Sequence, residues 1–298
     1  MANSIAARVV EWASEIEALL PALATGQLED INANSHGLVI ITGTPFSWSP
    51  LSTEGHRVQS QVLEAFRHFA ELVRVLTREQ PQELRREVEA DITRVTRFIE
   101  RDSASHGTPE RVLRDAVAEL TRLAAQIEKV FSARFGAVIV PDTNALYWNP
   151  ALEEWRHPDG SAFSIVLTPL VLSELDAHKD DPRNSSRQKK ANRLARQFGE
   201  YRRRGRLSDG VPLVSGVSTV ASIATEPRVA DSLPWLDASS PDDRFLTSAL
   251  EVMRQNTRAD VLVVTRDLNL QNKLDFAHLP SAHPDEFVRE ATQSTEGM

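Results

Sequence analysis

Apolar residues recur every three or four positions along most of the N-terminal part of the chain. This spacing places them on one face of a helix, so it predicts amphipathic helices. The predicted helices cover residues 5–24, 55–78, 81–101 and 108–130. Between the first two, residues 37–42 form a candidate short strand, and residues 43–50 have the Gly, Ser and Pro content of a loop. We therefore expect residues 1–134 to form an all-helical domain, a bundle of antiparallel helices.

The pattern changes at Ala137, where short uninterrupted apolar runs begin to alternate with helical segments. A run without alternation is typical of a strand buried on both faces of a parallel sheet. The predicted strands are residues 137–140, 163–167, 211–214 and 261–264. Strands that alternate with helices indicate an α/β domain. We therefore predict an α/β domain over residues 135–290, with a central parallel sheet flanked by helices, and a disordered tail over residues 291–298.

Acidic residues stand at corresponding places along this second domain. Asp142 follows the first predicted strand, Glu174 lies in the helix after the second, and Asp267 follows the strand at 261–264. Asp242 and Asp243 open the helix that starts near residue 241. Each alone has an ordinary explanation as a turn former, a helix cap or a partner of the helix dipole. Because the carboxyl ends of parallel strands share one edge, we expect Asp142, Asp243 and Asp267 to converge there. Glu174 would then face them from its helix.

The composition narrows the chemistry of such a cluster. The chain has no cysteine, which excludes disulfides, thiolate metal sites and a cysteine nucleophile. Carboxylates gathered in one pocket raise one another's pKa unless a cation is bound, and oxygen ligands favour Mg²⁺ or Mn²⁺ over Zn²⁺. Such ions promote hydrolysis of phosphodiesters. The sequence has no secretory signal and no apolar run that could span a membrane, so we expect a cytoplasmic protein without membrane association.

One stretch of the chain is strongly basic. The net charge of the whole chain is −8, but residues 183–206 contain ten Arg and Lys against one Glu. A charge asymmetry of this size indicates a polyanionic partner, although an Arg-rich helix is also commonly only a solvated face. The candidate nucleic-acid-binding residues are Arg187, Lys189, Lys190, Arg193, Arg202, Arg203 and Arg204.

Four short segments resemble, in order, the acidic motifs of PIN-domain ribonucleases. They are Pro141–Asn144, Ser173–Leu175, Asp242–Leu246 and Val263–Asn269, and the resemblance covers about half of the chain, roughly residues 136–285. The long basic insert is similar to the larger PIN group of RNA-decay nucleases and PhoH-like proteins. The resemblance implies an endoribonuclease that cuts single-stranded RNA with Mg²⁺ or Mn²⁺.

The resemblance also assigns roles to residues. Asp142, Glu174, Asp243 and Asp267 would be the catalytic, metal-binding acids. Thr143, Asn144 and Thr265 would orient them, and the adjacent Asp242 is an alternative to Asp243. The helical pattern favours Asp243, because it stands one turn before a core leucine.

Two other functions remain open from the sequence. The domain could be a catalytically silent module that binds RNA or a protein, or a structure-specific DNA nuclease, since related folds share this acidic edge. No resemblance covers the helical domain, which we expect to be a scaffold or a surface for a protein partner or a second copy of the chain.

Overall fold

A computed structural model describes residues 4–30, 46–102, 107–131, 136–180 and 184–287. The chain divides into two compact units, one formed by Ala6–Val130 and the other containing the residues from Phe131 onwards. The boundary predicted at residues 134/135, the candidate strand at 37–42 and the tail at 291–298 all lie outside the described residues. In the part of the chain that is described, no helix is both long and apolar enough to cross a membrane.

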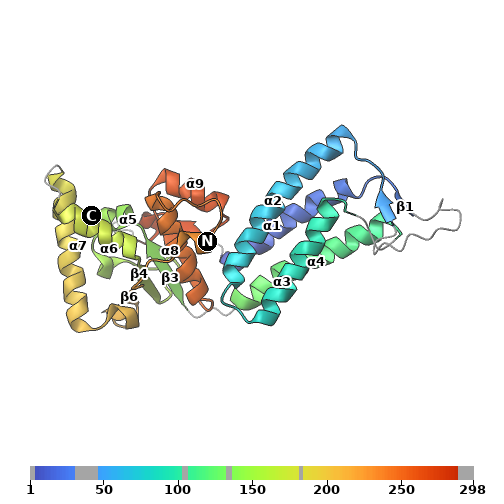
Figure 1. The fold of residues 1–298 in the computed structure, drawn as a ribbon. Coiled ribbons are helices and arrows are strands. Elements are labelled where there is room, and N and C mark those ends of the chain that lie inside the picture. Colours follow the sequence, from blue (N-terminus) through green and yellow to red (C-terminus); the bar gives the residue numbers. More distant parts are fainter. Residues whose placement is uncertain (1–3, 31–45, 103–106, 132–135, 181–183, 288–298) are drawn as a thin grey trace, which may run out of the picture. The chain divides into compact units, whose positions relative to one another are not determined.

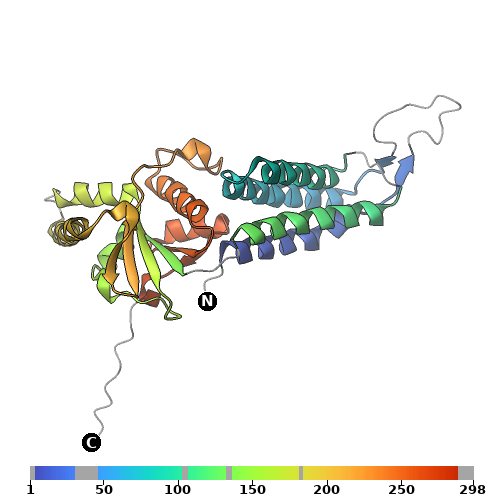
Figure 2. The same ribbon diagram turned by 90° about the horizontal axis from the view of Figure 1, so that it is seen from below.

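The N-terminal unit is mostly helical. Its helices are α1 (Ile5–Leu19), continued by the 3-10 turn η1 (Leu20–Leu23), α2 (Thr53–Thr77), α3 (Gln82–Ile99) and α4 (Pro109–Phe131), and they run alongside one another (Figures 1 and 2). Their apolar stripes form the core, where the rings of Trp12 and Phe69 meet edge to face with centroids 5.5 Å apart. Side-chain caps fix two of the predicted starts, since Ser52 accepts the Gly55 N–H and Thr108 accepts the Arg111 N–H.

The prediction of an all-helical unit needs one correction. Strand β1 (Leu28–Asp30) pairs antiparallel with β2 (Phe46–Trp48), so three residues of the predicted loop at 43–50 are a strand. The Arg101 guanidinium packs 4.4 Å from the centre of the Trp48 ring and donates to the carbonyls of Leu23, Thr25 and Ser49. These contacts join the β1–β2 pair to the helices. A strand of three residues is too short to show alternation, which is why the sequence did not predict it.

The C-terminal unit is built on a six-stranded sheet in the order β5-β6-β4-β3-β7-β8. The strands are β3 (Ala137–Pro141), β4 (Phe163–Leu167), β5 (Val211–Val214), β6 (Ser218–Ser222), β7 (Asp260–Val264) and β8 (Ser281–Ala282). All neighbours are parallel except β5 and β6. The predicted parallel sheet is thus a mixed sheet of mostly parallel strands. Only three residues separate β5 from β6, and so tight a connection can join only antiparallel strands.

Among the described residues, five α-helices flank this sheet. They are α5 (Thr143–Trp148), α6 (Pro169–Lys179), α7 (Ser185–Arg204), α8 (Pro241–Gln255) and α9 (Leu268–Phe276), with 3-10 turns η2 (Leu152–Glu154), η3 (Leu207–Asp209), η4 (Val229–Asp231) and η5 (Pro284–Phe287) (Figure 1). Thr168 and Ser240 cap α6 and α8 through the N–H groups of Val171 and Asp243. The expected α/β fold is confirmed for this half of the chain.

The sheet reverses its strand order next to β3. The chain leaves β3 for β4 on one side, whereas β7, much later in the sequence, pairs with β3 on the other side. The Asp142 N–H donates to the Val264 carbonyl at 3.0 Å, so the ends of β3 and β7 stay together. Ligands of open α/β sheets bind at the carboxyl ends of the strands where the order reverses, and the acidic residues stand at this place.

Candidate functional site

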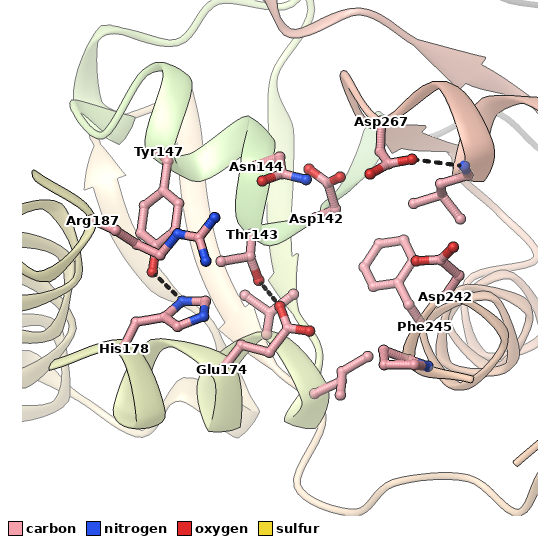
Figure 3. Close-up of a pocket in the computed structure, with 14 residues that line it drawn as sticks. Asp142, Thr143, Asn144, Tyr147, Glu174, His178, Arg187, Asp242, Phe245 and Asp267 are labelled. Atoms are coloured by element: carbon pink, nitrogen blue, oxygen red, sulfur yellow. Dashed lines mark hydrogen bonds between the residues drawn. The ribbon is translucent and has the colours of Figure 1, made fainter. Parts of the chain in front are cut away.

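A cavity of about 260 Å³ opens at the carboxyl ends of β3 and β7. Four carboxylates from four different segments line it, those of Asp142, Glu174, Asp242 and Asp267 (Figure 3). Apolar side chains close part of its wall, among them Leu170, Val171, Phe245 and Leu270. Residues separated by more than a hundred positions in the sequence are therefore brought to one site by the sheet topology.

Asp142 lies at the base of this cavity and is 7% exposed. One oxygen, Oδ1, caps α5 by accepting the Ala145 N–H at 2.6 Å, and the other, Oδ2, accepts the Thr265 hydroxyl at 2.6 Å. Burial raises the pKa of Asp142 from 3.8 to about 6, although these two hydrogen bonds lower it. The charges of Asp267 and Glu174 contribute to this rise. The sequence alternatives for Asp142 are thus both present: it is a helix cap and also part of a carboxylate cluster.

Glu174 reaches the cavity from α6, and Thr143 holds it. The Thr143 hydroxyl donates to Oε2 of Glu174 at 2.5 Å (Figure 3). Thr143 is buried, while the adjacent Asn144 is exposed and also lines the cavity. The predicted orienting role of Thr143 therefore has a direct contact behind it, and Asn144 is available to a ligand.

Asp267 occupies the N-cap of α9. Its Oδ1 accepts the N–H groups of Asn269 and Leu270 at 2.9 and 3.1 Å. The backbone N–H of Asp267 donates in turn to the Thr265 hydroxyl at 2.9 Å. Thr265 is fully buried, and its hydroxyl connects the two strand-end acids. The position of Asp267 thus depends on the Thr265 side chain, which is buried and out of reach of a ligand in the cavity.

Asp243 is the predicted acid that the structure places elsewhere. It is 6% exposed and does not line the cavity, because its Oδ1 accepts Lys273 Nζ at 2.6 Å and its Oδ2 accepts the Asp237 N–H at 2.9 Å. Asp243 is buried like Leu246 one turn later, but its carboxylate contacts a lysine and not the cavity. Asp242 lines the cavity in its place, where it accepts Asn269 Nδ2 at 2.6 Å.

Three further side chains form the opposite wall of the cavity, namely Tyr147, His178 and Arg187. The Tyr147 hydroxyl and Nδ1 of His178 are 2.8 Å apart (Figure 3). Burial raises the pKa of Tyr147 to about 12, so its hydroxyl stays protonated at neutral pH. Sequence reasoning missed Tyr147 and His178. The signal was their spacing, since each stands four residues after a site residue, Thr143 and Glu174, on the same helix face.

Most of the basic stretch at residues 183–206 lies in α7. Its apolar side, Ala191, Leu194, Phe198 and Tyr201, is buried, and its basic side is exposed. The exposed basic residues are Arg187, Lys189, Lys190, Arg193, Arg196, Arg202, Arg203 and Arg204. None of these residues forms an ion pair with a carboxylate of a described residue. The helix itself is held in place by Gln188, whose Nε2 donates to the Lys179 carbonyl at 3.0 Å. The positive charge is therefore open to solvent, and Arg187 carries it into the acidic cavity.

The donor set suits a hard cation. Among the described residues there is no ready-made group of three or more acidic or histidine side chains that could hold a metal ion. Mg²⁺, however, commonly binds through one or two carboxylates and keeps several waters. The cavity offers carboxylate oxygens of that kind. The raised pKa of Asp142 shows that its negative charge is unfavourable in the cavity, and a bound cation would stabilise that charge.

Comparison with known families gives a match to the C-terminal half of the chain. A family model described as a PIN domain matches residues 139–283, which run from β3 to β8 and include all of the acids described above. No curated protein matches the chain. PIN domains are generally nucleases and typically use divalent metals. The C-terminal half of this chain is therefore a PIN domain.

Proposed function

We propose that this PIN domain is a divalent-metal-dependent endonuclease that hydrolyses single-stranded RNA. The observation that carries the proposal is the gathering of Asp142, Glu174 and Asp267 around one cavity whose opposite wall holds Arg187. An acidic floor beside a basic wall is suited to a phosphodiester, because the first favours a cation and the second attracts the phosphate.

Asp142, Glu174 and Asp267 would hold the divalent ion, with Asp242 at the edge of the same set. When bound, Mg²⁺ or Mn²⁺ supplies Lewis-acid polarisation of the phosphate and activation of water. The protein's own contribution is to orient the carboxylates. Thr265 fixes Asp142 and the backbone of Asp267, and Thr143 fixes Glu174. Such supporting hydrogen bonds typically change metal affinity or activity by about 10- to 100-fold.

Water is the attacking group in this proposal. Hydrolysis assisted by a divalent ion needs no nucleophile from the protein, because a bound ion would activate water. Arg187 lines the cavity from α7 and is placed to contact a phosphate, where a guanidinium can bind two oxygens at once.

The exposed basic side of α7 supports RNA as the substrate. It starts at the cavity with Arg187 and continues along a helix of 20 residues to Arg204. A basic track of this kind binds the backbone of a nucleic acid without regard to its sequence. The helical unit has no place in this chemistry, and a protein partner or a second copy bound to it remains a prediction.

The test is a cleavage assay on end-labelled single-stranded RNA with Mn²⁺ or Mg²⁺. Controls are EDTA and the Asp142→Asn protein, which keeps a helix-capping side chain. We expect internal cuts that need both the metal and Asp142. RNA binding without metal-dependent products would instead support the silent binding module. Preferential cleavage of branched DNA over single-stranded RNA would support the structure-specific DNA nuclease.

A further inference from the structure

A second hollow, of about 560 Å³, adjoins the acidic cavity. The two share Asn144, Tyr147 and Asp267 in their walls. The second one adds Trp148, Lys190, Arg266, Leu268 and Asn269. A polymer chain bound across the carboxylates would therefore extend directly into this hollow, whose lining differs in being aromatic and basic.

The most distinctive feature of the hollow is a preordered aromatic platform. Trp148 is 47% exposed, and the guanidinium of Arg266 lies 3.6 Å from the centre of its ring. The indole N–H donates to Oδ1 of Asp285 at 2.5 Å. A large apolar ring is thus kept at the surface and held by two contacts, so little side-chain freedom is lost when a ligand binds to it.

The platform is tied to the acidic site through the chain itself. Trp148 ends α5, the helix that Asp142 caps, and Arg266 immediately precedes Asp267. The two side chains of the platform are therefore close in the chain to the acids, Trp148 at the other end of α5 from Asp142 and Arg266 next to Asp267. This places the hollow beside the reacting phosphate rather than at a remote point of the surface.

The rest of the lining matches the other parts of a nucleotide. Lys190, on the exposed side of α7, supplies a positive charge, and Asn144 and Asn269 supply amide groups. Aromatic rings and guanidinium planes both stack on nucleobases, and lysine attracts the phosphate. A stacking surface with a cation and amides around it is the usual composition of a site for an unpaired nucleotide.

We propose that this hollow binds the nucleotide next to the one whose phosphate is cut, with its base stacked on the Trp148–Arg266 pair and its phosphate near Lys190. The proposal rests on the proposed function and adds a cause for single-strand preference. A base inside a duplex is already stacked on its neighbours and cannot reach the indole without being extruded.

The experiment measures tryptophan fluorescence during titration with oligouridylate in EDTA, so that no cleavage occurs. We expect quenching in the wild-type protein and its loss in Trp148→Phe, which keeps a stacking ring. Trp148→Ala should bind the oligonucleotide roughly tenfold more weakly or worse, since stacking on an aromatic side chain is a main source of affinity. Trp235→Phe is the matched control, because Trp235 lies in the same unit, packs against Phe276 and lines neither cavity.

The outcomes separate this inference from the nuclease proposal. If Trp148→Ala binds and cuts single-stranded RNA like the wild type, the stacking site is overturned and the nuclease stands. Quenching by a blunt duplex as strong as by the single strand would also overturn it. If the wild-type protein neither binds nor cuts single-stranded RNA, both proposals fail. An oligonucleotide that lacks the stacked base should bind the wild-type and Trp148→Ala proteins with equal affinity. That result would support the stacked base as the contact that Trp148→Ala loses.

Discussion

The hydroxyl of Thr265 donates to Oδ2 of Asp142 over 2.6 Å and thereby links the ends of two adjacent strands. The hydroxyl oxygen of Thr265 also accepts the N–H of Asp267 at 2.9 Å, so one buried side chain sets the position of two acids. The carbonyl of Thr265 is in turn held by Gln271 Nε2 at 3.2 Å. A residue without access to substrate therefore controls the spacing of the carboxylates across the point where the strand order reverses.

Replacing Thr265 by Val keeps the shape of the side chain and removes both hydrogen bonds. The Asp142 carboxylate then loses a donor that lowers its pKa, and the Asp267 N–H loses its acceptor. We expect metal affinity, measured by calorimetry, to fall by roughly 10- to 100-fold and the activity to fall with it. Thr219→Val is the control, since that hydroxyl bonds Ser164 on β4. Equal metal affinity in the Thr265→Val and wild-type proteins would exclude the positioning role.

Asp142 should destabilise the metal-free protein at neutral pH. Its pKa rises from 3.8 to about 6 on folding, so the folded state binds the proton more tightly than the unfolded state does. The stabilisation from this group is complete below pH 4 and is lost as the pH rises through 6. A shift of this size corresponds to at most about 3 kcal/mol. In EDTA, Asp142→Asn should therefore be more stable than the wild type by roughly 1–3 kcal/mol at pH 8 and by about half as much at pH 5.

Denaturant unfolding of both proteins at the two pH values measures this difference. Mg²⁺ should then stabilise the folded wild-type protein, because an ion that binds only the folded state raises the free energy of unfolding. The stability of Asp142→Asn should be nearly unchanged, because this variant lacks a ligand for the ion. A less stable Asp142→Asn protein at pH 8 would show that the two hydrogen bonds of the carboxylate outweigh its desolvation.

Substitution of Asp242 should change metal affinity, whereas substitution of Asp243 should change stability. Asp242→Asn removes a carboxylate from the cavity and should lower metal affinity with little change in stability. Asp243→Asn leaves the Lys273 ammonium without its 2.6 Å partner and should cost about 1–3 kcal/mol of stability. The double variant Asp243→Asn with Lys273→Met removes both charges and should recover stability, because it leaves no unpaired charge behind. If that double variant folds but does not cut RNA, Asp243 belongs to the catalytic set.

The common location of the acids could be predicted from the sequence where they follow strands. Asp142 and Asp267 stand directly after buried apolar runs, so their common edge follows from the parallel topology alone. The choice between Asp242 and Asp243 could not be predicted, because it depends on how α8 is rotated and on the contact of Asp243 with Lys273 on α9, 30 residues later. Strand β6 was missed for a different reason: Ser218–Ser222 has one large apolar residue and shows no strand pattern.

The two ends of α7 should contribute to RNA binding differently. Arg187 and Lys190 line the two cavities, whereas Arg202 and Arg203 lie about 20–25 Å along the helix. Arg187→Ala with Lys190→Ala should weaken both short and long RNA. Arg202→Ala with Arg203→Ala should leave an oligonucleotide of about four nucleotides unaffected but weaken long RNA. The salt slope on long RNA should fall by about 0.7 for each phosphate that the variant no longer neutralises.

Arg204 is kept in this pair of variants because it donates to the Pro212 carbonyl of β5, so its removal would also disturb the fold. The matched control is Arg85→Ala with Arg86→Ala, an exposed neighbouring pair on α3 that removes the same charge from the helical unit. Filter binding at several salt concentrations gives the slopes. If the Arg202/Arg203 variant keeps the wild-type slope on long RNA, the RNA path ends near Lys190. If the Arg85/Arg86 variant flattens the slope as much, the effect comes from net charge and not from a track along α7.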